Sequence, residues 1–410
     1  MKRPQSLVPV VIVLSLVLLA GCAPAVARSS AEAVMYRHDA RRTGVYDTTG
    51  VPTLSGLKWK FQTGGAIWSS PVVAQGMVYL GSNDDFFYAV DAQSGEEQWR
   101  FETDGDVRSS AAVAEGVVYF GSFDGYVYAV DAVSGQEVWK VQVMQPLKER
   151  GPYDDYGSSP AVVNGVVYVG SLDRQCLHAL DARTGQEKWA FAPDDVEFVN
   201  TPPAIAGDMV YFGGATRGTV YALDVRTGQQ KWTFRATASV DYAPAIGDDG
   251  TVYVVSMDTH LYALDGQTGQ EKWRSILGGY ATFDPAPADG IVYVGTVERR
   301  LRSVDATFGL ALADGMVYVG TAERHLRAVD VATGQKVWRF NAGGRVSSSP
   351  AYVGGILYVG SGSGKVYAVE AQTGQEVWQF EAGGVVYSSP AVADGVVYFG
   401  GMDGYLYAVN

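Results

Sequence analysis

Short runs that alternate apolar and polar residues follow one another along most of the chain, in blocks of about 40 residues. Each block holds four strand-like runs: Ser-Ser-Pro-Ala-Val, Val-Val-Tyr-Val-Gly, Tyr-x-Tyr-Ala-Val-Asp and Trp-x-Phe. A glycine-containing turn, such as Glu115-Gly116, Asn164-Gly165 or Asp394-Gly395, separates the first two runs, and an Asp-x-x-Thr/Ser-Gly turn separates the last two. Because these residues favour tight hairpin turns, each block is predicted to form an antiparallel sheet of four strands.

A tryptophan marks the fourth run of each block and gives the period of the repeat. These residues are Trp59, Trp99, Trp139, Trp189, Trp232, Trp273, Trp338 and Trp378. Their spacings are 40, 40, 50, 43, 41, 65 and 40 residues. Four-stranded units at this period are typical of a β-propeller, so we expect an all-β, eight-bladed β-propeller over residues 57–410. Each tryptophan, a large apolar plate, is predicted to dock between neighbouring blades.

The two ends of the repeat carry complementary parts of one block. The last block stops at Asn410 after its third run, and the first tryptophan run, Leu57–Phe61, has no other run before it. We therefore expect the N-terminal strand to close the last blade, with Trp59 beside the strand Tyr405–Val409.

The spacing of 65 residues contains an internal duplication. Residues 288–305 and 313–330 are identical at fourteen of eighteen positions, and the first copy has no tryptophan run. Because strands alternate in direction, a surplus hairpin preserves the direction of the strands that follow. We predict one extra hairpin near 288–330, with a ninth blade as the alternative.

The first residues have the features of a targeting segment. Lys2 and Arg3 precede an apolar stretch that is too short for a comfortable membrane span, and Leu-Ala-Gly precedes Cys22. This arrangement resembles a bacterial lipobox, which implies a lipoprotein signal peptide over residues 1–21 and a diacylglycerol on Cys22. Residues 22–56 would then form a lipid-anchored tether and leader. The alternative is an ordinary signal peptide with an incidental cysteine.

The net charge and the cysteine content argue against a nucleic-acid partner and against a disulfide within the mature chain. The formal net charge of −13 argues against a nucleic-acid partner, which requires a basic surface. Cys176 is the other of the two cysteines in the sequence, so a disulfide within the mature chain is not expected.

The signature Ala-x-Asp-x-x-Thr/Ser-Gly-x-x-x-Trp recurs seven times. Its copies are Ala89–Trp99, Ala129–Trp139, Ala179–Trp189, Ala222–Trp232, Ala263–Trp273, Ala328–Trp338 and Ala368–Trp378, the last with Glu370 in place of the aspartate. It resembles the tryptophan-docking motif of the PQQ-like (quinoprotein-type) repeat superfamily. That superfamily holds quinone-dependent dehydrogenases and a non-enzymatic lipoprotein branch, the BamB type, and the fold alone does not choose between them.

The chain lacks the features that catalysis would require. Quinone enzymes of the superfamily typically carry an adjacent Cys-Cys pair, which is absent here, and the four histidines are scattered without metal-ligand spacing. We therefore expect no catalytic residues, no metal and no cofactor, with PQQ as the alternative. One aspartate per block, such as Asp91, is interpreted as a turn residue rather than a calcium ligand.

Positions that differ between blocks are candidates for binding. The residue before the Ser-Ser-Pro run is predicted to ring one mouth of the channel, together with basic residues at the turns between second and third runs. These candidates are Trp68, Arg108, Asn200, Asp241, Tyr387, Arg299 and Arg324. Aromatic and arginine side chains suit a binding surface. Ordinary loop variation is the alternative.

The expected function is a lipid-anchored cell-envelope scaffold that binds envelope proteins or unfolded outer-membrane protein segments. The chain would act as a monomer on the outer membrane, facing the periplasm, or on the outer side of the plasma membrane in a one-membrane host. The alternatives are a PQQ-dependent oxidoreductase and a surface module that binds carbohydrate or matrix.

Overall fold

The structure is a computed structural model, and its description covers a defined set of residues. These are 34–36, 39–41, 46–144, 158–171, 176–193, 199, 201–214, 216–241, 243–247, 249–258, 260–276, 280–281, 286–288, 291–293, 296–297, 310–313, 316–320, 324–330, 336–346 and 348–410. The chain divides into Met1–Glu32 and Ala33–Asn410, and the fold described below belongs to the second unit. No helix within the described ranges has the length and apolar character needed to cross a bilayer.

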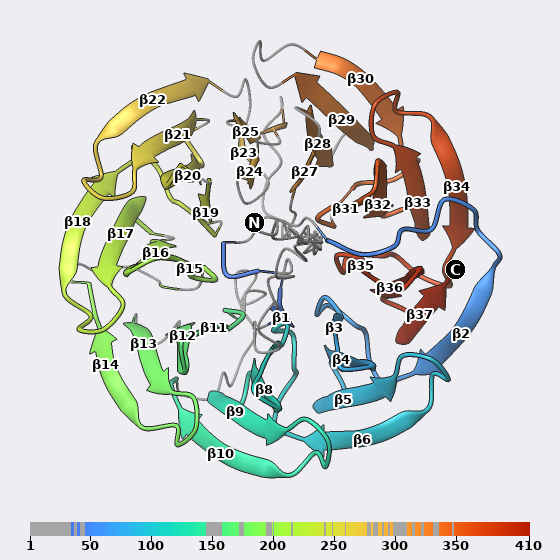
Figure 1. The fold of residues 1–410 in the computed structure, drawn as a ribbon, viewed down its shortest axis with the longest axis horizontal. Coiled ribbons are helices and arrows are strands. Elements are labelled where there is room, and N and C mark those ends of the chain that lie inside the picture. The colour runs from blue at the N-terminus through green and yellow to red at the C-terminus, as the bar shows by residue number, and fades with distance from the viewer. Residues whose placement is uncertain are drawn as a thin grey trace, which may run out of the picture. The chain divides into compact units, whose positions relative to one another are not determined.

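The described residues form eight antiparallel sheets, the blades, which follow one another around an axis (Figure 1). Seven blades have four strands, and a short strand, β1 (Val34–Met35), adds a fifth to blade two. Blade one is the first sheet whose four strands follow one another in the chain, and the blades are numbered in chain order from there. The innermost strands of blades one to eight are β3 (Val72–Ala74), β7 (Ala112–Ala114), β11 (Ala161–Val163), β15 (Ala204–Ala206), β19 (Ala245–Ile246), β27 (Leu310–Ala313), β31 (Ala351–Val353) and β35 (Ala391–Ala393). The second strands are β4 (Met77–Gly81), β8 (Val117–Gly121), β12 (Val166–Ser171), β16 (Met209–Gly213), β20 (Thr251–Ser256), β28 (Met316–Gly320), β32 (Ile356–Gly360) and β36 (Val396–Gly400).

The third and outer strands complete each blade. The third strands are β5 (Phe86–Asp91), β9 (Tyr126–Asp131), β13 (Cys176–Asp181), β17 (Thr219–Asp224), β21 (His260–Asp265), β29 (His325–Asp330), β33 (Lys365–Glu370) and β37 (Tyr405–Val409). The outer strands are β6 (Glu97–Glu102), β10 (Glu137–Gln142), β14 (Glu187–Phe191), β18 (Gln230–Arg235), β22 (Glu271–Ile276), β30 (Lys336–Asn341), β34 (Glu376–Glu381) and β2 (Leu57–Gln62). The predicted all-β propeller architecture is confirmed.

The ring closes in the way the chain ends predicted. Strand β2 pairs antiparallel with β37, with Trp59 opposite Ala408 and Gln62 opposite Tyr405. The innermost strands contact one another around the axis, except that β24 (Ala286–Ala288) lies between β19 and β27, and β35 of blade eight contacts β3 of blade one. The N-terminal strand therefore supplies the outer strand of the last blade, as expected.

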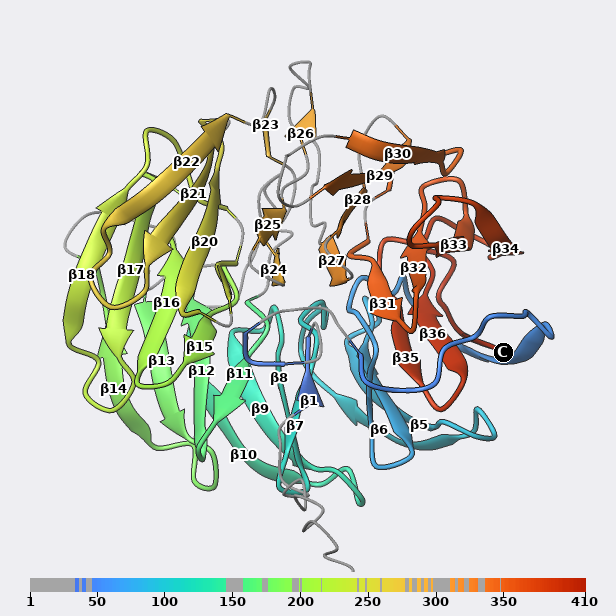
Figure 2. The ribbon, with the colours of Figure 1, turned by 45° about the horizontal axis from the view of Figure 1, so that its top comes forward.

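The duplicated segment forms short strand pairings between blades five and six. Strands β24 (Ala286–Ala288) and β25 (Ile291–Tyr293) pair with each other, and β23 (Tyr280–Ala281) pairs with β26 (Thr296–Val297). Strand β24 contacts the innermost strands on both sides, β19 and β27 (Figure 2). The second copy forms β27, β28 and β29 of blade six. The described part of this region holds these two two-stranded pairings, and the choice between an extra hairpin and a ninth blade stays a prediction.

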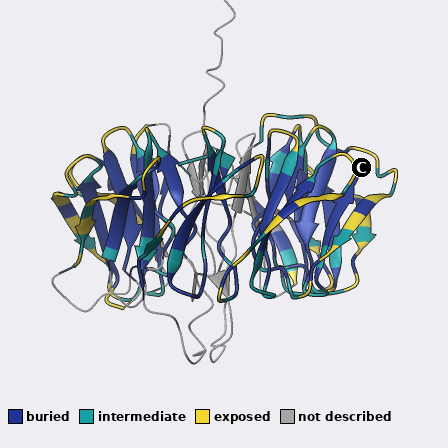
Figure 3. Ribbon diagram, turned by 90° about the horizontal axis from the view of Figure 1, so that it is seen from below, coloured by how far each residue is buried: buried dark blue, intermediate teal, exposed yellow. Residues whose placement is uncertain are grey.

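Burial follows the position of each strand in its blade. The second and third strands of the fully described blades are buried almost throughout, because a neighbouring blade covers each of their faces (Figure 3). The outer strands instead alternate: in β6, Trp99 is buried while Glu97, Gln98 and Arg100 are exposed. This pattern is expected of an edge strand with one face against the next blade and one face in water. Charged residues along it also protect the free edge from pairing with other chains.

The Ser-Ser-Pro run links each blade to itself and to the next. The Oγ of Ser69 accepts a hydrogen bond from the amide of Gly81 at 2.9 Å and donates to the carbonyl of Gly81 at 2.8 Å. The amide of Ser70 donates to Ser110 Oγ of the next blade at 3.0 Å, and the amide of Ser389 donates to Ser70 Oγ at 3.0 Å across the closing seam. The motif is therefore a structural device of the inner ring.

Seven of the eight marker tryptophans dock through the same contact, six on the next blade and Trp378 on the N-terminal leader. Each indole Nε1 donates to a backbone carbonyl at 2.8–3.2 Å, in the pairs Trp59–Ala92, Trp99–Ala132, Trp139–Ala182, Trp189–Val225, Trp232–Gly266, Trp338–Ala371 and Trp378–Val51. A glycine of the Asp-x-x-Thr/Ser-Gly turn lies under six of these rings. Gly269, with φ +72°, is one, and an added Cβ there would lie 2.6 Å from Trp232. The turn needs glycine both for the positive φ and for the close approach.

Candidate binding surface on the loop face

The two sides of the ring carry different connections. On one side, here called the loop face, the links between blades lie against the turns between second and third strands: the amide of Val107 donates to the carbonyl of Ser82 at 3.0 Å. On the other side, the turn face, the two remaining kinds of turn meet, and the amide of Ala92 donates to the carbonyl of Gly76 at 2.9 Å. The candidate residues before the Ser-Ser-Pro run belong to the loop face.

Three of the predicted binding residues come together on the loop face. The rings of Trp68 and Tyr387 stack, with centroids 5.2 Å apart and an interplanar angle of 24°. The guanidinium of Arg108 lies 5.5 Å from the centre of the Trp68 ring and 5.1 Å from that of Phe123. These contacts join blades eight, one and two across the closing seam. Trp68 and Tyr387 are both partly exposed, so the pair presents an aromatic surface to solvent.

The position of Arg108 differs from the expectation that it would be exposed. Its side chain is 7% exposed and forms an ion pair with Asp106 at 3.0 Å, the Asp106 side chain being 4% exposed. Its Nε donates to Asn83 Oδ1 at 3.2 Å. The arginine is buried because a carboxylate, an amide and two aromatic rings surround it, and its role here is to position Trp68.

Two further candidates, Asp241 and Arg324, lie in other blades. Asp241 accepts a hydrogen bond from Ser239 Oγ at 3.0 Å within its own loop, and Arg324 is exposed at a turn of blade six with φ +70°. Asn200, Arg299 and Cys22 lie outside the described residues.

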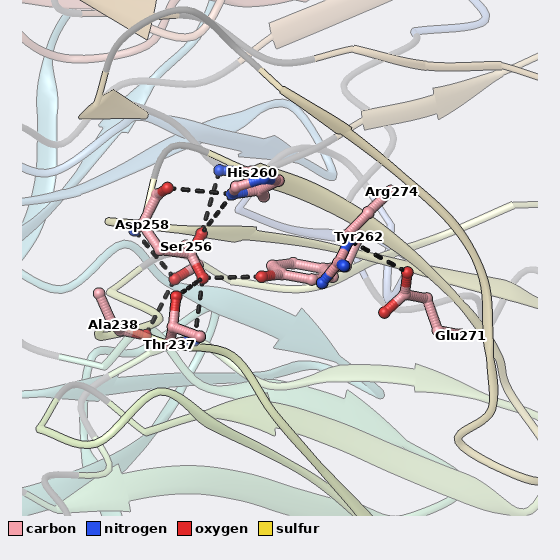
Figure 4. A network of polar contacts seen from close by, with 8 residues as sticks. All are labelled: Thr237, Ala238, Ser256, Asp258, His260, Tyr262, Glu271 and Arg274. Carbon is pink, nitrogen blue, oxygen red and sulfur yellow. Dashed lines mark hydrogen bonds and ion pairs between the residues drawn. The ribbon is translucent and has the colours of Figure 1, made fainter.

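A network of polar contacts that the sequence analysis did not predict stabilises the loop face of blade five (Figure 4). Asp258 Oδ2 accepts hydrogen bonds from the Tyr262 hydroxyl at 2.7 Å and from Oγ1 and the amide of Thr237 at 2.8 and 2.9 Å. Its Oδ1 accepts from the His260 amide at 3.0 Å. Burial raises the pKa of Asp258, but these donors outweigh it and lower the pKa overall. The carboxylate is fully engaged, so the network fixes a turn.

The same aspartate–tyrosine pair recurs in three other blades, which identifies it as part of the repeat. The tyrosine hydroxyl donates to the aspartate at 2.6–2.7 Å in the pairs Asp84–Tyr88, Asp124–Tyr128 and Asp403–Tyr407. Burial and the neighbouring carboxylate raise the pKa of Tyr407 to about 12. The detectable signal in the sequence is an aspartate four residues before the third-strand tyrosine.

The aspartates of the turns between third and outer strands hold those turns, as interpreted from the sequence. Asp91 Oδ1 accepts from the amides of Gln93 and Ser94 at 3.0 and 2.7 Å, and Asp131, Asp181, Asp224 and Asp265 do the same in their blades. Within the described residues there is no group of three or more His, Cys, Asp or Glu side chains arranged to hold a metal ion.

The turn that Asp224 opens is expected to make the stability of the fold depend on pH. A hydrogen bond from Lys231, with further donors in the turn, lowers the pKa of Asp224 from 3.8 to about 2, and Lys231 Nζ lies 3.2 Å from its Oδ2. The ionised form is therefore favoured by folding, so its stabilisation is present above about pH 4 and lost as the pH falls to about 2. We expect the urea midpoints of the wild type and of Asp224→Asn to differ at pH 6 and to converge at pH 2. A difference that grows on acidification would contradict this assignment.

The segment before β2 crosses the axial channel, which the sequence did not indicate. Strand β1 (Val34–Met35) pairs antiparallel with β7 of blade two. The carbonyl of Ala40 accepts a hydrogen bond from Ile205 of blade four at 3.0 Å, and the Tyr46 amide donates to Tyr352 of blade seven at 3.2 Å. The described parts of this leader, residues 34–51, therefore bond to inner strands on opposite sides of the ring. A cavity of about 140 Å³ remains beside the leader, between β3 and β35.

Comparisons with known proteins give one sequence family and several solved structures. The model of the family described as outer membrane protein assembly factor BamB, PQQ_2, matches residues 52–234, 216–312 and 322–410. No curated protein matches the chain.

Three solved structures illustrate the range of proteins that share the fold. A europium-containing methanol dehydrogenase has a TM-score of 0.71 at 17% identity, over 93% of this chain and 98% of the other. Quinohemoprotein alcohol dehydrogenase from Comamonas testosteroni has a TM-score of 0.70 at 16% identity, and the match covers 92% of this chain and 80% of the other. BamB from Moraxella catarrhalis has a TM-score of 0.62 at 18% identity, and the match covers 87% of this chain and 97% of the other. At these identities the likeness is one of fold, and it includes enzymes and an assembly factor alike. Because the matched sequence stretches cover most of the chain, this protein belongs to the PQQ-like repeat family of outer membrane protein assembly factor BamB.

Proposed function

We propose that this protein is a cell-envelope scaffold, anchored by lipid on Cys22, which binds protein segments during outer-membrane protein assembly. Membership of the BamB family supports this role. In a host with an outer membrane, the ring would face the periplasm from the inner leaflet of that membrane. Growth with labelled palmitate should label the wild-type chain and leave Cys22→Ser unlabelled, and equal labelling of both would contradict the anchor.

The observation that carries the proposal is the position of the leader. The inner strands of all blades converge on the axis, which is where a small-molecule site could gather residues from many blades. The described leader residues occupy that region and bond to the inner strands of blades two, four and seven. The cavity of about 140 Å³ beside them is smaller than the 300–1,000 Å³ of usual small-molecule sites. This arrangement favours binding on the outside of the ring.

The loop face offers a surface for such binding. Trp68 and Tyr387 form a partly exposed aromatic pair that Arg108 holds in place. Aromatic side chains on a rigid framework bury large areas at little entropic cost, and they are frequent at the centre of protein interfaces. Loops on a rigid scaffold commonly carry recognition.

Site-specific crosslinking in the intact, anchored chain tests the proposal. A photoreactive phenylalanine analogue at Tyr387 is expected to crosslink to barrel-assembly components or to unfolded outer-membrane proteins. The matched control is the same analogue at Val133, which is 83% exposed on the turn face. Equal crosslinking from both positions, or products from Tyr387 that contain only carbohydrate, would overturn the proposal.

A quinone titration tests the enzymatic alternative directly. The purified chain, mixed with PQQ and calcium, is expected to give no saturable change in the quinone absorbance and no dye-linked alcohol oxidation. Saturable binding at micromolar PQQ, lost when Trp68 is replaced, would move the assignment to an oxidoreductase.

A further inference from the structure

The first described strand shows from which side the leader enters the channel. Strand β1 pairs antiparallel with β7, with Val34 opposite Val113 and Met35 opposite Ala112. Strand β7 runs towards the turn at Glu115-Gly116, which lies on the turn face because the carbonyl of Gly116 accepts the amide of Ala132. Strand β1 runs the opposite way, so its first residue, Val34, is the one nearer the turn face.

A contact one residue further along agrees with this direction. The hydroxyl of Tyr36 lies 3.4 Å from Oγ of Ser349. Ser349 belongs to the Ser-Ser-Pro run of blade seven, at the loop-face end of β31, and its amide donates to Ser389 Oγ of blade eight at 3.0 Å. From Val34 to Tyr36 the leader therefore passes from the turn face towards the loop face.

The far end of the leader also lies at the turn face. The carbonyl of Thr49 accepts a hydrogen bond from the amide of Gly395, and Thr48 Oγ1 accepts one from the amide of Asp394, both at 3.1 Å. Asp394 and Gly395 form the turn between β35 and β36, which is a turn of the turn face. Strand β1 itself contacts the inner strands β3 and β7 (Figure 1). The chain thus enters the ring close to the axis and on the turn face.

The segment between the candidate lipidation site and β1 is short. It comprises the twelve residues from Cys22 to Ala33. Twelve residues span at most about 40 Å when fully extended, whatever path they take. A flexible chain of this length has a root-mean-square span of about 20 Å. A lipid on Cys22 would therefore keep the bilayer close to the point where the leader enters.

The route from that point to the loop face uses up the whole tether. It crosses four strands spaced about 4.8 Å apart and then follows an outer strand of six residues, about 35 Å in all before side chains and turns are added. The route through the channel passes the leader itself, whose described residues bond to the inner strands of blades two, four and seven. A membrane at the turn face needs neither route.

We propose that the leader sets the orientation of the ring on the membrane, with the turn face towards the lipid headgroups and the loop face away from them. The Trp68–Tyr387 surface then lies at least the length of a strand, about 20 Å, from the turn-face side. Its partners are polypeptide segments in the aqueous compartment, and segments embedded in the bilayer are out of its reach. This inference rests on the proposed anchor and narrows the class of partner.

Energy transfer to lipid headgroups tests the orientation. The mature Cys176→Ala chain is coupled through the thiol of Cys22 to a maleimide lipid in phosphatidylcholine vesicles, so the measurement does not require lipidation in the cell. A donor dye is attached through a clickable phenylalanine analogue at Gln98 or at Glu102, exposed residues at the turn-face and loop-face ends of β6. The dye at Gln98 is expected to lie about 13 Å closer to a headgroup acceptor, the length of four strand residues.

A second pair of positions distinguishes a flat ring from a ring that stands on its rim. Lys231 and Arg235 are exposed at the corresponding ends of β18, across the ring from β6 (Figure 1). Transfer should again be stronger from the turn-face end, Lys231. Strong transfer from both ends of one strand and weak transfer from both ends of the other would overturn the proposal.

Two controls establish that the leader is the cause. A Cys22→Ser chain coupled instead through Ser363→Cys, an exposed turn position on the loop face, should reverse the order of each pair. An insertion of about 30 Gly-Ser residues after Cys22 raises the root-mean-square span of the tether from about 20 to about 35 Å, and it should at least halve the difference within each pair.

Three results would contradict the inference. These are stronger transfer from Glu102 than from Gln98 in the chain coupled through Cys22, equal transfer from both, and an undiminished difference with the long tether. The last result would assign the orientation to adhesion of the turn face to lipid. Failure of palmitate labelling would remove the natural anchor and leave this geometry measurable, so the two proposals fail separately.

Discussion

Replacing Trp232 with alanine is expected to lower the free energy of unfolding by about 3–5 kcal/mol, the usual cost of removing a buried tryptophan. Replacing Trp273 with alanine should lower it by less, because Trp273 is already 41% exposed. The two residues share a register, a repeat position and a neighbouring tyrosine ring, so the comparison isolates the covering turn. Trp232 loses its contact with Gly269 and its hydrogen bond to Gly266, whereas Trp273 has neither partner in the described structure.

Urea unfolding of the two variants, followed by circular dichroism, measures the difference. A third variant, Gly269→Val, serves as a control because it leaves Trp232 in place but removes the space beneath the ring. It should be destabilised to a similar extent as Trp232→Ala. Equal losses for Trp232→Ala and Trp273→Ala would show that the tryptophan stabilises its own blade and not the next one.

The features that repeat along the chain were predictable, because each copy carries the same turn residues and the same alternation of apolar and polar positions. The tryptophan period and the Asp-Gly and Asp-x-x-Thr/Ser-Gly turns were enough to predict four-stranded sheets arranged in a propeller. The missing outer strand at Asn410 and the unaccompanied strand at Leu57 required the ends to pair, and Trp59 does lie opposite Ala408. The strict alternation of strand direction predicted that the duplication adds a hairpin, and the choice against a ninth blade stays a prediction.

The features that depend on contacts between distant parts of the chain were not predictable. Nothing in residues 34–51 identifies inner strands as their partners, since most of these contacts are backbone hydrogen bonds that carry little side-chain information. Arg108 was expected to be exposed because it varies between blocks, yet Asp106, Asn83 and two rings bury it. Trp273 is 41% exposed, unlike the other marker tryptophans, and the motif centred on Trp273 gives no sign of this difference.

The leader and the closing strand act on the same seam. The leader covers Trp378 through Val51, and four residues later the amides of Ser55 and Gly56 both bond to the carbonyl of Asn410 at the end of β37. The segment thus holds blades seven and eight together before it forms β2. A propeller in which the first strand completes the last blade depends on this seam, because the remaining blade-to-blade contacts are made by residues close in sequence.

A chain that begins at Thr63 is therefore expected to lose its closed ring. Without β2, the edge of β37 has no partner, and unpaired edges associate with other chains. Loss of the Trp59 ring alone should lower the free energy of unfolding by about 3–5 kcal/mol, and loss of the strand should lower it further. The protein should elute from a size-exclusion column as oligomers.

A chain that begins at Pro52 is the matched control for this truncation, since it keeps β2 and loses only the leader. It should remain monomeric with an exposed Trp378. Adding a synthetic peptide of residues 46–62 to the chain that begins at Thr63 should restore the monomer, because the peptide supplies both the outer strand and the Val51 carbonyl that Trp378 requires. A monomer with unchanged melting temperature in the absence of the peptide would show that β2 does not close the ring. Restoration by a peptide of residues 57–62 alone would assign closure to the strand and leave the leader the separate task of filling the channel.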